Sequence, residues 1–399
     1  MLEPGSCGVR ARVATALLAL GVVAGCGEAS RNPSRESPAT GGTSAGAAGE
    51  VGVAGQAGFG GTAGSLLTAG ANAGGAAPTE DPCPIPLADW EPVQGDVFVG
   101  AGNMVATHKY AVASTDTDTV LLPIAEQAPE AMVSPIPIDA SIRSPEAAWD
   151  GDDGALYVLG AAQTGFLLAR VEASGHATTV NIQGAFSVPG RGAVAQAGQR
   201  VAVSGGDGSG NFVVHLFDDD LGPIKSFTLP KHGFGSLTSD AEGLRLAVTD
   251  SAAKTLEIYR ITDAELTLLR TEPLASLPFP FTLAWAGDSA VLEIGDQLVL
   301  VDPSGKQATF APPTKDGTSG IYRLTVTSSA LGDVLGADVS NAPFVGRLRD
   351  GVLEWAGPGE QCVFSDVRAD DQSIGVYYVR TLGPRTLAYF GFKCPARAP

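Results

Sequence analysis

The stretch Ser239–Asp250, with the sequence SDAEGLRLAVTD, decides the fold of this chain. A polar turn that contains Gly243 is followed by an apolar strand, Leu244–Thr249, which stops at Asp250. A short alternating apolar run bounded by Gly and Asp is typical of a β-strand entered from a tight turn. The same turn-and-strand phrase recurs along the chain, and its recurrence predicts the architecture.

The interval between copies of this phrase is nearly constant. From the first matched position to the fifth, each follows the previous one by 45 residues, and the last two intervals are 43 and 42 residues. A second strand follows most copies, as in 166–171, and a weaker run usually follows that. The matched positions are Ala111, Leu156, Val201, Leu246, Val291, Val334 and Val376.

Units of about 40–50 residues with four period-2 strands each are typical of β-propellers. One such blade cannot bury both faces of its sheet, but neighbours around a ring can cover them. The sequence therefore predicts an all-β chain with a single β-propeller of seven blades, each of four antiparallel strands. Six or eight blades remain open, because the first and last copies are the least regular. The constant interval disfavours a pair of non-repeating β-sandwiches.

The N-terminus resembles the signal of bacterial lipoproteins. Arg10 and Arg12 precede the apolar run Val13–Val23, which is too short to span a bilayer as a stable helix. The following Val23-Ala24-Gly25-Cys26 resembles a lipobox. This resemblance implies cleavage before Cys26, a diacylglyceryl group on its sulfur and stable anchoring by two or more acyl chains. Gly27, where aspartate commonly marks inner-membrane retention, favours the outer membrane. An ordinary secretory signal is the alternative.

The segment after the signal is expected to be a disordered linker. Residues 27–80 are mostly Gly, Ala, Ser and Thr, and they cannot bury enough apolar area to offset the cost of ordering the backbone. The predicted organisation is a signal peptide at 1–25, a lipidated Cys26 with a disordered linker at 26–82, and the propeller at 83–399. A coil of this kind has an r.m.s. reach of ~40 Å, which would hold the propeller off the membrane.

Composition narrows the possible partners. The formal net charge is −18, which argues against nucleic acid as a partner because phosphates need basic surfaces. An acidic surface serves solubility, and it also suits a cationic ligand. We expect a monomer without a cofactor.

The cysteines predict how the ring closes. Apart from Cys7 and Cys26 of the N-terminal signal, the chain contains Cys83, Cys362 and Cys394. The last repeat supplies three strands, and the unassigned candidate for its fourth strand is Pro84–Trp90. The third strand of an antiparallel blade ends beside the start of the fourth, so we expect a Cys83–Cys394 disulfide, with Cys362 unpaired at the opposite end of the blade. An exported location permits this bond. The competing pair is Cys362–Cys394.

No catalytic constellation is visible in the sequence. The four histidines lie outside H-x-H and H-E-x-x-H patterns, so neither a catalytic residue nor a metal site is expected. Ligands of propellers usually meet the loops between second and third strands and the crossings between blades. Aspartate is also a common residue at strand ends, so a local role at the end of a strand is the alternative for the aspartates among the candidate residues. The candidate binding residues at these places are Asp116, Asp118, Arg143, Arg191, Asp207, Lys231, His232, Asp250, Asp338 and Arg380.

Two classes of function follow. The first is a membrane-anchored extracytoplasmic propeller in the cell envelope, periplasmic or surface-facing, that binds a protein, peptide or glycan or serves as a scaffold. The second is a propeller enzyme of the lactonase, lyase or glycosidase kind, with acidic or histidine side chains, or a metal, at the central axis. The fold alone does not choose between them.

Overall fold

The computed structural model describes residues 82–125, 128–184, 186–187, 193–230, 232–276, 282–318, 320–360, 362–380 and 383–395. The predicted signal peptide, Cys26, nearly all of the linker and the candidate residues Arg191 and Lys231 lie outside these ranges. The side chain of Cys362, predicted to be unpaired, is not described either. Within the described ranges, no helix has the length and apolar character needed to cross a membrane.

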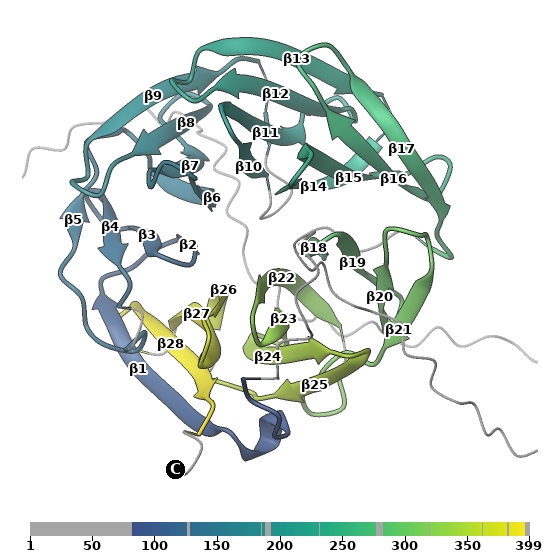
Figure 1. Cartoon of the computed structure of the whole chain (residues 1–399). Coiled ribbons are helices and arrows are strands. Elements are labelled where there is room, and N and C mark those ends of the chain that lie inside the picture. The colour runs from purple at the N-terminus through teal and green to yellow at the C-terminus, as the bar shows by residue number, and fades with distance from the viewer. Residues whose placement is uncertain are drawn as a thin grey trace, which may run out of the picture. The chain divides into compact units, whose positions relative to one another are not determined.

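The described chain forms seven four-stranded antiparallel sheets that follow one another around a ring (Figure 1). The predicted seven-bladed β-propeller is confirmed. Each matched position of the repeat lies in the second strand of a blade. The innermost strands contact one another in ring order, β2 to β6, β10, β14, β18, β22, β26 and back to β2.

We number the blades in chain order and give the strands of each from the axis outward. Blade 1 contains β2 (Met104–Ala106), β3 (Tyr110–Ser114), β4 (Thr119–Pro123) and β5 (Ile136–Pro137). Blade 2 contains β6 (Ser144–Asp150), β7 (Leu156–Ala161), β8 (Phe166–Val171) and β9 (Ala177–Ile182). Blade 3 contains β10 (Val194–Ala197), β11 (Arg200–Gly206), β12 (Phe212–Asp218) and β13 (Pro223–Leu229).

The remaining blades have the same order. Blade 4 contains β14 (His232–Asp240), β15 (Gly243–Asp250), β16 (Thr255–Ile261) and β17 (Leu266–Pro273). Blade 5 contains β18 (Leu283–Ala286), β19 (Ser289–Ile294), β20 (Gln297–Val301) and β21 (Gln307–Phe310). Blade 6 contains β22 (Ile321–Ser329), β23 (Gly332–Val339), β24 (Ala342–Arg349) and β25 (Val352–Ala356). Blade 7 contains β26 (Cys362–Ala369), β27 (Ser373–Arg380), β28 (Thr386–Lys393) and, outermost, β1 (Glu91–Val99).

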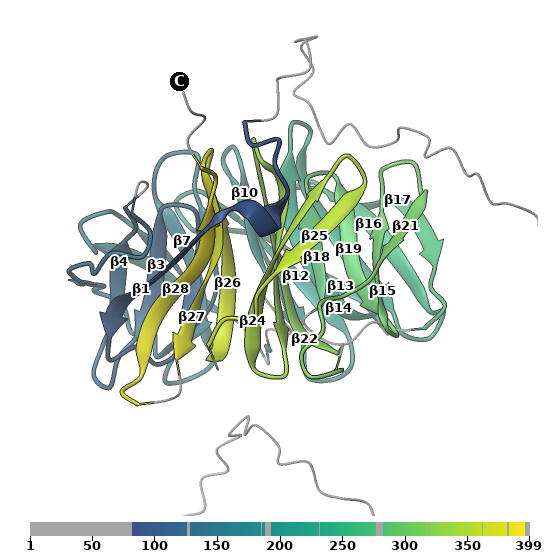
Figure 2. The same ribbon diagram turned by 90° about the horizontal axis from the view of Figure 1, so that it is seen from below.

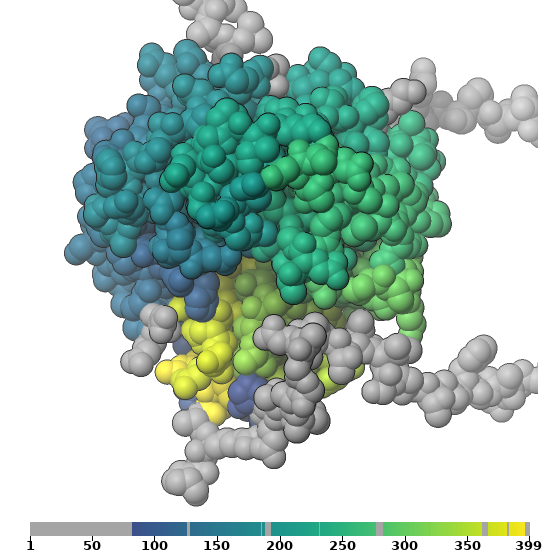
Figure 3. Space-filling view, turned by 45° about the horizontal axis from the view of Figure 1, so that its top comes forward, coloured from purple at the N-terminus to yellow at the C-terminus, as the bar shows by residue number. Residues whose placement is uncertain are grey.

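The ring has two faces, because every strand runs between the same two ends of its blade (Figure 2). We call the end with the first-to-second and third-to-fourth strand loops the cavity face. We call the end with the second-to-third strand loops and the connections between blades the crossing face. The space-filling view shows the teal and green blades as one continuous packed surface (Figure 3).

The hydrophobic core is divided among the seven junctions between blades. Seven clusters of buried side chains each combine residues of two neighbouring blades. Strand β15 shows how alternation produces this, since Leu244, Leu246 and Val248 pack in the cluster shared with blade 3. Ala247, on the other side of the strand, packs in the cluster shared with blade 5. A blade therefore depends on both neighbours for burial.

The closing strand differs from the predicted one. The predicted segment was Pro84–Trp90, but the strand is β1, and Leu87–Asp89 instead forms a short 3-10 helix, η1. Proline at 84 and 86 removes amide donors that a ladder needs, and the amides of Asp89 and Trp90 donate back to Pro86 and Leu87. The ladder with β28 starts only at Glu91, which pairs with Lys393.

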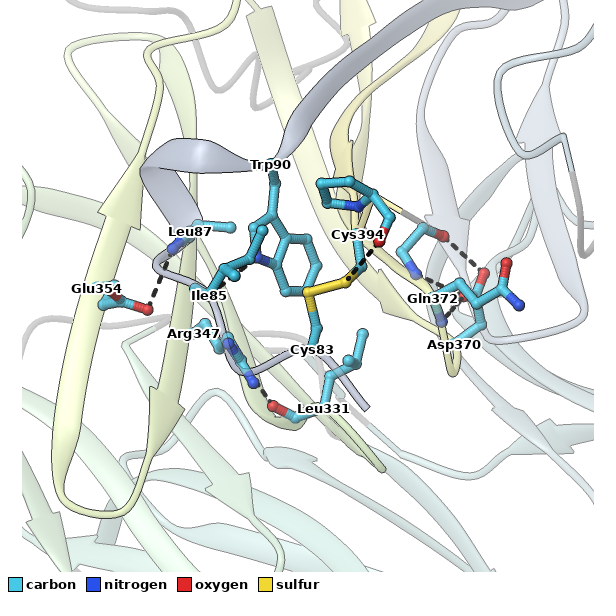
Figure 4. Close-up of a disulfide and its surroundings, with 12 residues drawn as sticks. Cys83, Ile85, Leu87, Trp90, Leu331, Arg347, Glu354, Asp370, Gln372 and Cys394 are labelled. Atoms are coloured by element: carbon cyan, nitrogen blue, oxygen red, sulfur yellow. Dashed lines mark hydrogen bonds between the residues drawn. A yellow bond between two sulfur atoms is a disulfide. The ribbon is translucent and has the colours of Figure 1, made fainter. Parts of the chain in front are cut away.

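The Cys83–Cys394 disulfide is nevertheless present, and it joins residues 311 positions apart with a Cα–Cα distance of 6.0 Å. Figure 4 shows the bond beside the ring of Trp90, which lies under the Arg347 guanidinium at 5.2 Å. Arg347 Nε donates to the carbonyl of Leu331 in blade 6 at 2.9 Å. The N-terminal segment therefore covers the junction between blades 6 and 7 and links the two ends of the ring.

Removal of this bond by the double substitution Cys83→Ser and Cys394→Ser should lower the free energy of unfolding by about 3–5 kcal/mol, because the disulfide closes a very long loop in the unfolded chain. Urea unfolding of the oxidised protein measures the change. A reductant should lower the midpoint of the wild type and leave the double variant unchanged. Equal midpoints for the two oxidised proteins would show that the bond does not stabilise the ring.

Candidate functional site

A cavity of about 830 Å³ lies on the axis at the cavity face. It is lined by the ends of innermost strands and by the loops that follow them, including Thr107–His108, Ser236–Glu242 and Asp366–Ala369. Trp149 and Trp285 also line it. Both tryptophans pack at blade junctions. The cavity is thus formed by positions that the repeat brings together from most of the blades.

Side chains on innermost strands bind the turns of neighbouring blades around the cavity mouth. Asp150 of blade 2 accepts hydrogen bonds from Thr107 Oγ1 at 2.7 Å and from the His108 amide at 3.0 Å, both in blade 1. Asp366 of blade 7 accepts from the Ala106 amide at 2.8 Å. Ser328 of blade 6 accepts from the Gly287 amide of blade 5 at 3.0 Å. These contacts fix the mouth, because each loop is bound by an adjacent blade.

Blades 4 and 5 contribute an ion-pair network to the cavity wall. Arg245 Nη1 lies 3.1 Å from Asp240 Oδ2 and 3.1 Å from Asp288 Oδ1. Arg260 Nη1 lies 3.1 Å from Asp240 Oδ1, and its Nη2 lies 2.5 Å from Glu242 Oε2. The Arg245 guanidinium also covers the Trp285 ring at 5.5 Å. Asp240 is largely buried between two guanidinium groups, whereas Glu242 and Asp288 reach solvent, with side-chain exposures of 79% and 45%.

Sequence reasoning missed this network, although four of its five charged residues lie within or near the stretch that decides the fold. Asp240, Glu242 and Arg245 belong to the quoted turn and strand, and Arg260 follows on β16. The register pairs Arg245 with Arg260 across β15 and β16, so two guanidinium groups come together and need acidic partners. The sequence feature that could have indicated the network is the D-x-E-x-x-R spacing of Asp240, Glu242 and Arg245.

Charged side chains are paired with one another in the cavity wall at blades 4 and 5. Its arginines are engaged by carboxylates, and the solvent-facing groups at the blade 4 and blade 5 rim include Glu242 and Asp288. The described residues contain one group of three His, Cys, Asp or Glu side chains with ligand atoms close enough for a metal, and that group lies away from the cavity lining. The rim therefore offers carboxylates to a cationic or polar ligand.

The predicted binding residues that the structure describes lie on the crossing face, and most of them serve the local structure. Asp207 accepts from the Asn211 side chain at 2.8 Å and from the Ser209 amide at 2.7 Å, and the Asn211 contact in particular lowers the pKa of Asp207. Arg380 pairs with Asp96 and lies 3.3 Å from Glu360.

The other predicted residues are dispersed over this face. Asp116 and Asp118 are exposed in the loop between β3 and β4, and Arg143 is exposed just before β6. Asp338 is buried near the end of β23. The predicted carboxylates therefore belong to separate blades rather than to one described pocket.

His232 and Asp250 are the two predicted residues that the structure brings together. Glu257 lies beside them. One potential metal-ligand atom from each of the three side chains lies within 4.8 Å of the other two. Tyr259 donates to Glu257, and burial together with this contact raises the pKa of the Tyr259 hydroxyl well above its usual value. A second cavity of about 670 Å³ adjoins His232. Nothing in the sequence indicated that Glu257 groups with His232 and Asp250, because it lies on β16, the third strand of the blade.

Comparison with known proteins supports the fold. No protein-family model matches the chain, and no curated protein matches its sequence. The structure of virginiamycin B lyase from Staphylococcus aureus is similar over 75% of this chain and 99% of its own, with a TM-score of 0.52 and 13% identity. A streptogramin B lyase structure is similar over 77% of this chain and 99% of its own, with a TM-score of 0.52 and 8% identity. At these identities the likeness establishes a β-propeller fold.

The cavity network should contribute to stability, because Arg245 neutralises a largely buried carboxylate. Substitution Arg245→Met should lower the free energy of unfolding by about 1–3 kcal/mol, since Asp240 then loses one of its two cationic partners. The matched control is Arg200→Met. Arg200 pairs with Asp263 at 2.8 Å, but both side chains are well exposed, so the cost should stay below about 1 kcal/mol. Equal costs in urea unfolding would contradict this role of Arg245.

Proposed function

We propose that this protein is an extracytoplasmic binding module, anchored in the outer membrane through a lipid on Cys26, that captures a protein, peptide or glycan in its axial cavity. The observation that carries the proposal is the axial cavity, whose mouth is fixed by hydrogen bonds between neighbouring blades. A fixed polar site loses little entropy when it binds, which favours recognition.

Charge favours a basic peptide or protein segment among these partners. Glu242 and Asp288 present carboxylates to solvent at one side of the mouth, and the chain as a whole has a formal charge of −18. The negative electrostatic potential of these groups attracts cationic ligands from a distance and aligns them with the mouth of the cavity. Trp149, which is partly exposed, adds apolar surface to the lining for the body of a side chain.

The alternative function is that of a propeller enzyme, for which the similar lyase folds give a precedent of architecture alone. Catalysis at the axis would need acidic, histidine or metal-binding groups that converge on a substrate. Asp240, the carboxylate between Arg245 and Arg260, is instead paired within the wall. We therefore favour binding over catalysis as the function of the axial cavity.

Retention on a library of peptides and glycans that differ in charge tests the binding site. The purified protein should retain basic peptides at low salt and release them as salt screens the charges. The double substitution Glu242→Gln and Asp288→Asn should weaken retention roughly fivefold to tenfold.

The matched control for this experiment is Asp116→Asn with Asp118→Asn, which removes the same charge from the crossing face. This control should bind like the wild type. Loss of binding in the control alone would move the site to the crossing face, and turnover of a retained compound would support the enzyme instead.

The anchor is tested by metabolic labelling with palmitate. The wild type should incorporate label and sediment with outer membranes, because two or more acyl chains suffice for stable anchoring. Cys26→Ala should incorporate none. Cys7→Ala should label normally, since Cys7 precedes the apolar run of the signal. An unlabelled wild type would contradict the anchor and leave an ordinary secretory signal as the explanation.

A further inference from the structure

The register of blade 4 assembles three potential metal ligands at its crossing-face end. His232 on β14 pairs directly with Asp250 on β15. Glu257 on β16 pairs with Val248, which points to the same side of β15 as Asp250 because side chains alternate. Neighbouring strands therefore place an imidazole and two carboxylates together, although 25 residues separate His232 from Glu257.

The hydrogen bonds of His232 orient one ring nitrogen toward this cluster. Nδ1 lies 2.9 Å from the carbonyl oxygen of Pro230, which only accepts, so Nδ1 is the nitrogen that donates. Nε2 faces Glu257 Oε2 at 2.8 Å, and that oxygen also accepts from the Tyr259 hydroxyl. In a neutral imidazole, Nε2 would direct its lone pair at a carboxylate oxygen. A metal cation between these atoms would accept the lone pair and bind the carboxylate oxygen.

The surroundings of the three side chains match those of metal ligands. A metal-bound histidine almost always donates its other nitrogen to a carbonyl or carboxylate, as His232 donates to Pro230. Tyr259 orients Glu257, and the amides of Ala252 and Ala253 orient Asp250 through its Oδ1 at 2.7 and 2.9 Å. The side chains of His232 and Glu257 are only 9% and 15% exposed, so the group is not a solvated acidic patch.

We propose that His232, Asp250 and Glu257 form a zinc-binding site. Zn²⁺ accepts one imidazole nitrogen and two carboxylate oxygens at about 2.0–2.2 Å, which in a tetrahedron places these atoms about 3.4 Å apart. The observed separations, from 2.8 Å to no more than 4.8 Å, bracket that value. Calcium is disfavoured because it takes oxygen ligands and would need more of them. This proposal differs from the expectation from sequence that the chain has no metal site.

The fourth position of the zinc ion would be left for water or a ligand. The adjoining cavity is lined by blade 3 residues such as Gly208 and Asn211 and by His232, Phe234 and Ser251 of blade 4 and its loops. A metal at this place would lie beside the junction of two blades. The site is independent of the axial cavity and of the function proposed for it, since it lies at the other end of β15, roughly 20 Å away along the strand.

Zinc titration of the metal-free full chain in detergent, by calorimetry and by metal analysis after dialysis, tests the proposal. The wild type should bind one zinc ion per chain at this site. His232→Ala and Asp250→Asn should each weaken binding at least about 100-fold, and Tyr259→Phe should weaken it about tenfold through its effect on Glu257. Cobalt in place of zinc should give the visible bands of a four-coordinate ion in the wild type and lose them in His232→Ala.

The matched control is His176→Ala. His176 pairs with Asp139 at 2.8 Å in the same kind of His–carboxylate contact, but both side chains are exposed and, among the residues that the structure describes, they belong to no group of three potential ligands. Its zinc binding should equal that of the wild type. Asp250→Asn keeps the carbonyl oxygen that the turn amides need, so it serves if His232→Ala fails to fold. Equal zinc binding by the wild type, His232→Ala and Asp250→Asn, or none in the wild type, would overturn the site.

Discussion

The structure depends on the burial of both faces of every blade by its two neighbours. The seven hydrophobic clusters are shared between adjacent blades, so each sheet depends on its position in the ring for a core. The ring is closed only if blade 7 has a fourth strand. Strand β1 supplies this strand by pairing with β28. The disulfide and the packing of Trp90 beside Arg347 strengthen the same junction.

The same alternation that buries the apolar residues distributes the polar ones to two sites. On β15, Arg245 lies on the side toward blade 5 and at the cavity face, where it pairs with Asp240 and Asp288. Asp250 ends the strand at the crossing face, on the side toward blade 3, beside His232. One repeated strand thus serves an axial cavity at one end and a candidate metal site at the other. Both proposed sites lie at strand ends because the strand interiors are committed to packing.

The repeat was sufficient to predict the fold class, the number of blades and the Cys83–Cys394 disulfide. A fixed interval and a fixed strand order determine which strand ends lie side by side. The closing strand was assigned a few residues too early, since local proline chemistry at Pro84 and Pro86 decides where a ladder can begin. The grouping of Glu257 with His232 could not be found from spacing along the chain. It follows from pairing across three strands, and a single β-bulge can change such pairing.

Urea unfolding of a chain that lacks Glu91–Val99 tests the central claim most directly. The closing strand covers one edge of blade 7 and is part of the cluster shared with blade 1. If the ring depends on closure, the deletion should strongly lower the midpoint or abolish the cooperative transition, and amides in β27 and β28 should lose their protection from hydrogen exchange. An unchanged midpoint and slope would contradict the account, since the blades would then be stable without a closed ring.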